Sequence, residues 1–177
     1  MGADIHSFAE VRTTGKWVRV TEPVFGDYDD KKTTEPFAWR SYAVFGFLAD
    51  VRNYSCCKPI CEPKGLPDDS EYINRISPYG YGGTFKEALQ EDYNYHSFSW
   101  LTLNELLDFD YEQTFCDRRV SKQVSPRGWN NAALAEEGEG QIVTYREHLG
   151  NGFFKDIEVL KTLGSSEDVR IVFWFDN

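Results

Sequence analysis

The sequence has no long apolar run, no excess of basic residues and no linker, repeat or low-complexity tract. A membrane-spanning helix needs roughly 20 apolar residues, and no stretch approaches that length. The first residues also lack the basic and then apolar order of a signal peptide. The formal net charge of -10 argues against broad nucleic-acid binding, which relies on a basic surface. We therefore expect a single cytoplasmic domain, residues 1–177, with neither a membrane nor a nucleic-acid partner.

Histidine is scarce, and this limits the metal chemistry that the chain supports. Only His6, His96 and His148 are present. Dinuclear metallophosphoesterases begin with a pair like Asp4-Ile5-His6, but they need further histidines in Gly-Asn-His and Gly-His-x-His settings. Gly150-Asn151-Gly152 lacks that ligand, so this class is excluded. A nucleophile elbow, a P-loop and a dinucleotide fingerprint are missing from the sequence too.

Cysteine is also limited, to Cys56, Cys57, Cys61 and Cys116. In a reducing compartment disulfides are uncommon. A zinc site formed by these cysteines is an alternative. Structural zinc sites, however, usually combine one closely spaced pair of Cys ligands with a second pair of ligands elsewhere in the chain. We expect small buried thiols and no resident cofactor.

Hydrophobic periodicity predicts an α+β fold with a mainly antiparallel sheet, helices on one face and a long ordered loop. Alternating apolar residues predict strands at both ends of the chain, at residues 2–11 and 168–176, and a hairpin leads from the first to a strand at 16–20. Helical spacing predicts a helix over residues 40–51, with Ser41 as its start signal.

Three capping boxes predict further helix starts, at Thr84 to Glu87, Thr102 to Glu105 and Thr144 to Glu147. Residues 53–83 are rich in proline and glycine. Their aromatic content is too high for disorder and predicts an ordered loop that covers a pocket. A turn is predicted at residues 127–131.

The polar face of the first predicted strand is a candidate site. Asp4, His6 and Glu10 share this face with Phe8. One interpretation is an ordinary solvated face. A divalent-metal site formed by Asp4, His6 and His96 is an alternative, as is metal-free acid and base chemistry by His6 and His96.

Arginine and aromatic residues favour an anionic ligand. Arg40 and Arg52 flank the predicted helix and Arg75 lies in the long loop. A guanidinium group binds phosphate or carboxylate through paired hydrogen bonds, although each arginine is also typical of a surface ion pair. Together with His6, His96 and abundant Tyr and Trp, these residues suit a small nucleotide-like ligand.

Several segments resemble a widespread family of phage and prophage proteins, and the likeness covers nearly the whole chain. They are Met1–His6, Arg40–Tyr42, Phe45–Asn53, Pro59–Ile60, Gly65–Ser70, His96–Thr102 and Asp168–Asp176. The family carries no settled function. The resemblance implies a phage accessory protein, of the kind that sequesters or degrades a nucleotide signal or blocks a host protein.

We therefore expect a phage accessory protein in the host cytoplasm that binds a small nucleotide-like or phosphorylated ligand, for counter-defence by sequestration. The expected pocket lies between the N-terminal strand and residues 53–101. Its expected ligand-binding residues are Asp4, His6, Arg52, Asn53, Asp68, Ser70, His96, Ser97 and Trp100. The alternatives are a hydrolase that uses His6 and His96 and an acidic blocker of a host protein. Whether the chain is an enzyme and how it oligomerises stay open.

Overall fold

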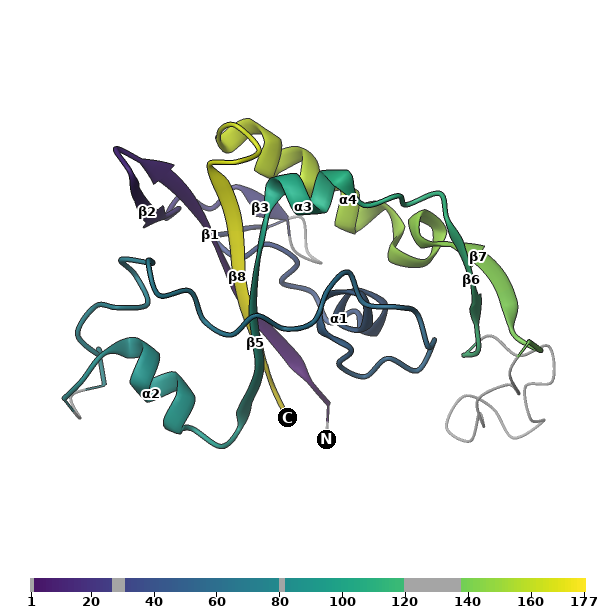
Figure 1. The fold of residues 1–177 in the computed structure, drawn as a ribbon, viewed down its shortest axis with the longest axis horizontal. Coiled ribbons are helices and arrows are strands. Elements are labelled where there is room, and N and C mark those ends of the chain that lie inside the picture. The colour runs from purple at the N-terminus through teal and green to yellow at the C-terminus, as the bar shows by residue number, and fades with distance from the viewer. Residues whose placement is uncertain (1, 27–30, 80–81, 120–137) are drawn as a thin grey trace. The chain divides into compact units, whose positions relative to one another are not determined.

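The structure, a computed structural model, describes residues 2–26, 31–79, 82–119 and 138–177 (Figure 1). The turn predicted at residues 127–131 lies outside these ranges. The chain divides into two compact units. Unit 1 comprises Met1–Arg40, Pro63–Asp108 and Gly152–Asn177, and unit 2 comprises Ser41–Glu62 and Phe109–Asn151. Each unit is described by itself below.

Unit 1 is built on a four-stranded sheet in the order β2-β1-β8-β5. The strands are β1 (Asp4–Thr13), β2 (Lys16–Arg19), β5 (Tyr95–Thr102) and β8 (Val169–Asp176), and every neighbouring pair is antiparallel. The two ends of the chain therefore meet as the central strands (Figure 1). Seven of the eight residues of β8 are buried, as expected for a strand with neighbours on both sides and cover on both faces. The predicted α+β class is confirmed.

One face of this sheet, which we call the tryptophan face, packs against α2 (Phe85–Glu91) and the segment before it. Its buried cluster consists of Phe8, Leu66, Ile73, Phe85, Leu89, Val172 and Trp174. Phe8 pairs with Val172, and the period of two in a strand puts Trp174 on the same face. The predicted capping box is present, because the Thr84 hydroxyl accepts from Glu87 N–H and the Glu87 carboxylate accepts from Thr84 N–H.

The opposite face of the sheet is approached by residues 152–163, the part of α4 (Tyr145–Leu163) that belongs to unit 1, and by residues 36–37. Ser7 on this face donates a hydrogen bond to the carbonyl of Pro36, and the neighbouring Phe37 stacks on Phe153 of α4 at a centroid distance of 4.8 Å. Helical segments of unit 1 thus lie near both faces of the sheet.

The remaining elements of unit 1 are short. β3 (Phe25–Gly26) pairs with β4 (Lys32–Thr33), and α3 (Leu103–Asp108) follows β5 directly. The predicted capping box at Thr102 is present, with Glu105 N–H donating to the Thr102 hydroxyl and Thr102 N–H donating to the Glu105 carboxylate. This cap fixes where β5 becomes helix.

Unit 2 contains α1 (Tyr42–Ala49), the hairpin of β6 (Thr114–Asp117) with β7 (Gln141–Thr144), and the first turns of α4. Ser41 caps α1 as predicted. Phe47, Phe109 and Tyr145 pack edge to face in its core. α4 is interrupted at Gly150, which has a φ of 74° and leaves the helical conformation there.

The described residues between α1 and α2 form no helix or paired strand, so the predicted long loop is present. It is divided between the units at Glu62 and Pro63. No helix within the described ranges has the length and apolar character needed to cross a membrane.

Candidate binding site

His6 lies on the tryptophan face near the start of β1. It pairs across the sheet with Trp174, and the two rings stack with their centroids 5.6 Å apart. Its Nε2 lies 3.2 Å from the Asp176 carboxylate, and Tyr95 meets the ring edge-on at 5.3 Å. His6 is half-buried. This arrangement holds one ring nitrogen against a carboxylate, as in many histidines that bind or transfer protons.

Asp4, the other half of the Asp4-Ile5-His6 motif, is engaged by an arginine. Arg40 donates from Nε to Asp4 Oδ1 at 2.7 Å and from Nη2 to Asp4 Oδ2 at 2.6 Å. These hydrogen bonds lower the pKa of Asp4. The predicted motif therefore contributes a salt bridge and a half-buried histidine to the end of the sheet.

His96 lies on the face opposite to His6, so the two imidazoles do not converge as the metal and the acid–base alternatives require. His96 pairs with Phe175, whereas His6 pairs with Trp174, and adjacent residues of β8 point to opposite faces. The His96 ring contacts Phe175, and its two nitrogens lie 3.0 Å from the Ser97 hydroxyl and 2.9 Å from the Asn177 amide. Asp4, His6 and His96 therefore do not form one ligand set.

Ser97 occupies an irregular position in β5. The register of β5 on β8 shifts between His96 and Ser99, and Ser97 has a φ of 53°. An extra residue in one strand is a β-bulge, which redirects the side chains around it. Sequence periodicity alone would not show this shift.

The other predicted site residues are spread through both units. Asp68 forms an exposed pair with Lys86, and Ser70 donates to the buried carboxylate of Glu10. Trp100 packs on the tryptophan face, and Arg52 and Asn53 belong to unit 2. The residues expected to line one pocket thus have separate local roles.

A groove in unit 1 provides a different candidate site. It lies along α2 and the start of β5 and has a volume of about 810 Å³. Its lining residues are Tyr79, Gly82, Gly83, Glu87, Ala88, Leu89, Glu91, Asp92, Tyr93, Asn94 and Tyr95. Three carboxylates and three tyrosines therefore face this groove, and its described lining has no lysine or arginine. Tyr95 also contacts His6, so the groove borders the start of β1.

The electrostatic surroundings of the groove are negative. Burial is the first cause that raises the pKa of Tyr95, and the charges of Tyr79, Asp92 and Asp176 add to it. The N–H and hydroxyl of Thr84 lower the pKa of Glu87 and hold its carboxylate ionised. An anion placed here would meet the same repulsion as a tyrosinate at Tyr95.

Sequence reasoning did not select these groove residues. The signal available was local: Glu91-Asp92-Tyr93-Asn94-Tyr95 combines acids and tyrosines immediately after a capped helix. Tyrosine and acidic residues are each common on protein surfaces, so this composition alone does not indicate a site. Only the folded chain shows that Tyr79 lines the same groove as this segment.

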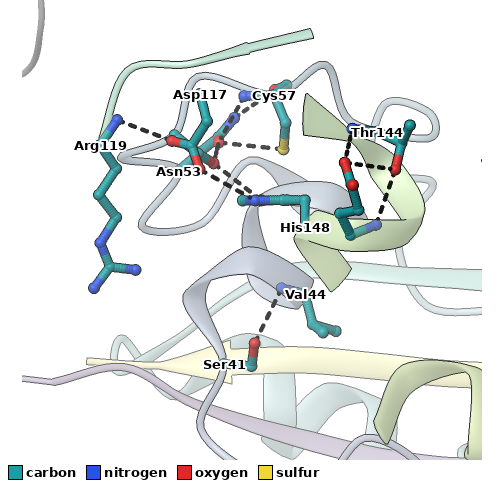
Figure 2. A network of polar contacts seen from close by, with 10 residues as sticks. Ser41, Val44, Asn53, Cys57, Asp117, Arg119, Thr144 and His148 are labelled. Atoms are coloured by element: carbon teal, nitrogen blue, oxygen red, sulfur yellow. Dashed lines mark hydrogen bonds and ion pairs between the residues drawn. The ribbon is translucent and has the colours of Figure 1, made fainter. Parts of the chain in front are cut away.

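A second polar cluster lies in unit 2 and contains a serine, a histidine and an aspartate. Ser55 Oγ lies 3.1 Å from His148 Nε2, and His148 Nδ1 lies 3.4 Å from Asp117 Oδ2. Figure 2 shows the side chains of Asp117 and His148 pointing toward one another, with Asn53 and Cys57 beside them. Burial opposes ionisation of Asp117, but hydrogen bonds from His148 and from Arg119 N–H lower its pKa overall.

Asn53 organises the loop that carries Ser55. Its Oδ1 accepts from Cys57 N–H at 3.1 Å, and its Nδ2 donates to the Asp50 carboxylate and to the Cys57 carbonyl, both at 2.7 Å. Asp50, Arg52 and Cys56 in this loop have positive φ values. Such conformations cost free energy and persist only where the surroundings impose them, and the hydrogen bonds of the Asn53 amide provide that restraint.

This cluster has the order of a nucleophile, a base and an acid, but its burial favours a structural role. Ser55 is only 3% exposed, and the side chains of His148 and Asp117 are almost as buried. A nucleophile must meet its substrate within hydrogen-bond range, and this hydroxyl is instead enclosed by Asn53 and His148. The cluster stabilises the loop of unit 2.

The four cysteines are free thiols, of which Cys57 is buried and Cys56 is exposed. Burial raises the pKa of Cys57 to about 11, so this thiol is protonated at neutral pH. Within the part of the chain that the structure describes, no three His, Cys, Asp or Glu side chains gather as metal ligands would.

Comparisons with known proteins identify no relative: no protein family, no curated protein and no solved structure matches this chain.

Proposed function

We propose that this protein acts by binding a partner protein through the groove of unit 1, as an acidic blocker. The observation that supports it most is the exposure of large side chains around an acidic groove. Tyr93 is 94% exposed, Tyr79 is 63% exposed, and Ile76, which pairs with Thr84 at the start of α2, is 84% exposed.

Exposed tyrosines are typical of binding surfaces because they supply a large rigid contact area with a polar tip. Alanine scanning of interfaces finds tyrosine repeatedly among the few residues that carry most of the binding free energy. The net charge of -10 agrees with a partner of opposite charge, since complementary charge speeds association. We expect a host protein as the partner, and this expectation comes from the resemblance to phage proteins.

A small nucleotide-like ligand in the same groove is a second candidate. A volume of about 810 Å³ is within the range of small-molecule sites, and a nucleobase stacks well on tyrosine. The carboxylates would suit ribose hydroxyls better than phosphate. The two-histidine hydrolase has no support from this geometry, because His6 and His96 lie on opposite faces of the sheet.

A random peptide library displayed on yeast tests the proposal without knowledge of the partner. The purified chain is used as bait, and the affinity of each recovered peptide is measured by fluorescence anisotropy. We expect the double variant Tyr79→Ser and Tyr93→Ser to weaken binding at least about tenfold, which corresponds to about 1.4 kcal/mol.

Tyr54→Ser is the matched control, since Tyr54 is an exposed tyrosine of unit 2. It should leave the affinity unchanged. Recovery of no specific peptide, or of peptides that bind the double variant equally well, would overturn the proposal. Calorimetric titration with nucleosides and nucleotides tests the second candidate. If that candidate is right, these ligands should bind the wild type and bind the Tyr79→Ser and Tyr93→Ser double variant more weakly.

A further inference from the structure

We infer that the groove of unit 1 receives an arginine side chain of the partner. This inference rests on the proposed function and names the chemistry that the groove recognises. The described lining residues carry negative charge on Glu87, Glu91 and Asp92 and no positive charge to balance it. A cation that enters the groove would therefore be attracted to these carboxylates and would reduce the repulsion between them.

The three carboxylates differ in how free they are to bind. Glu87 is engaged by the capping box of α2, and Asp92 accepts from the backbone N–H of Asn94 at 3.0 Å. Glu91 ends α2, where the helix carbonyls carry partial negative charge and favour a cation. The end of α2 therefore combines fixed acceptors with the negative end of a helix.

Tyrosine rings favour arginine over lysine. A guanidinium group is planar, stacks on aromatic faces and loses less hydration than an ammonium group does. Unit 1 already uses this contact next to the groove: the guanidinium of Arg75 lies 3.9 Å from the Tyr72 ring centroid and 5.1 Å from that of Phe85 in α2. Tyr79 and Tyr95 offer further rings of the same kind on the groove side.

The planar fork of arginine also matches the acceptors at the end of α2. One guanidinium group donates five N–H bonds in fixed directions, whereas an ammonium group is a point charge. One guanidinium group therefore has enough donors for a tyrosine-stacked arginine to bind more than one of the carboxylates that line the groove. Citrulline has almost the same shape but no charge, so it separates the contribution of charge from that of shape.

The test uses N-acetyl-arginine methylamide as the probe, followed by NMR of the 15N-labelled chain. We expect saturable shifts at Ala88, Asn94 and Tyr95, with an affinity at least about fivefold above that of the citrulline analogue and above that of the lysine analogue. The double variant Glu91→Gln and Asp92→Asn should lose this preference. Glu158→Gln, an exposed carboxylate of α4, is the control and should keep it.

Equal binding of arginine and citrulline, or no saturable shift in the groove, would overturn the inference. The two proposals fail in distinguishable ways. If library peptides bind through Tyr79 and Tyr93 without any need for arginine, the binding function stands and the arginine specificity falls. If neither peptides nor the arginine probe bind, both fall.

Discussion

Glu10 and Arg170 form an ion pair in the interior of unit 1, with Arg170 Nε 2.7 Å from Glu10 Oε2. Glu10 is fully buried and Arg170 is 2% exposed. The Arg170 guanidinium lies 4.1 Å from the Trp17 ring centroid and 5.5 Å from that of Trp100, and its Nη1 donates to Asp69 at 2.8 Å. The pair therefore joins β1 and β8 on the tryptophan face, near the start of β8.

Removal of one partner from this pair should be strongly destabilising. Arg170→Met leaves the Glu10 carboxylate buried without its cation, and we expect a loss of about 3–5 kcal/mol in the free energy of unfolding. Denaturant titration measures this loss. The double variant Glu10→Leu and Arg170→Met should be more stable than Arg170→Met alone, because it removes the unpaired charge as well.

Arg12→Met is the matched control, because Arg12 forms a comparable ion pair with Asp168 at 2.7 Å on the surface. An exposed pair contributes about 0–1 kcal/mol. Equal losses for Arg12→Met and Arg170→Met would contradict the importance of burial.

Asp156 of α4 should make the stability of the protein depend on pH. Burial raises the pKa of Asp156 to about 6, although N–H groups of Phe37 and Gly26 favour its ionised form. The folded state then binds a proton more tightly than the unfolded state does. This contribution is fully present below the unfolded pKa near 3.8 and is lost as the pH rises through about 6, a change of about 3 kcal/mol.

Denaturant titration of the wild type and of Asp156→Asn between pH 4 and pH 7 tests this prediction. The wild type should gain stability relative to the variant as the pH falls. Asp168→Asn should show the opposite sign below about pH 4, where the wild type loses stability relative to this variant as the pH falls, because hydrogen bonds from Ser165 and Arg12 lower the pKa of Asp168. A difference between wild type and Asp156→Asn that does not change with pH would be incompatible with a raised pKa.

The Ser55 cluster should respond as a structural network and not as a catalytic one. We expect no labelling of Ser55 by a fluorophosphonate probe, because its hydroxyl is enclosed. Ser55→Ala should lower the free energy of unfolding by about 1–2 kcal/mol, since His148 Nε2 and Asn53 Oδ1 each lose a neighbour. Labelling that disappears in Ser55→Ala would show that the site is open to substrates.

The capping box at Thr102 should contribute measurably to the free energy of unfolding. Thr102→Ala removes the acceptor of Glu105 N–H at 3.2 Å, and we expect a loss of about 1 kcal/mol in thermal or denaturant unfolding. Thr21→Ala, an exposed position outside any helix or strand, should change stability by less than about 0.5 kcal/mol. Equal effects at the two positions would mean that the cap is not formed in solution.

Local signals in the sequence predicted much of the secondary structure. The terminal strands, the hairpin from β1 to β2, the Ser41 cap and the three capping boxes follow from interactions within a few residues, and all are present. The division into two units was not predicted, because it depends on which distant segments share contacts. The single-domain prediction for residues 1–177 is not tested by this division.

The sequence by itself determined the α+β class and the acidic, aromatic character of the chain, since periodicity, capping and charge are properties of neighbouring residues. Only the tertiary structure decided where the functional chemistry gathers. The pairing of β8 with β1 and β5 sends His6 and His96 to opposite faces, because strand register alternates side chains. The folded chain also brings Tyr79 into the same groove as Tyr93 and Tyr95, together with the carboxylates of Glu87, Glu91 and Asp92.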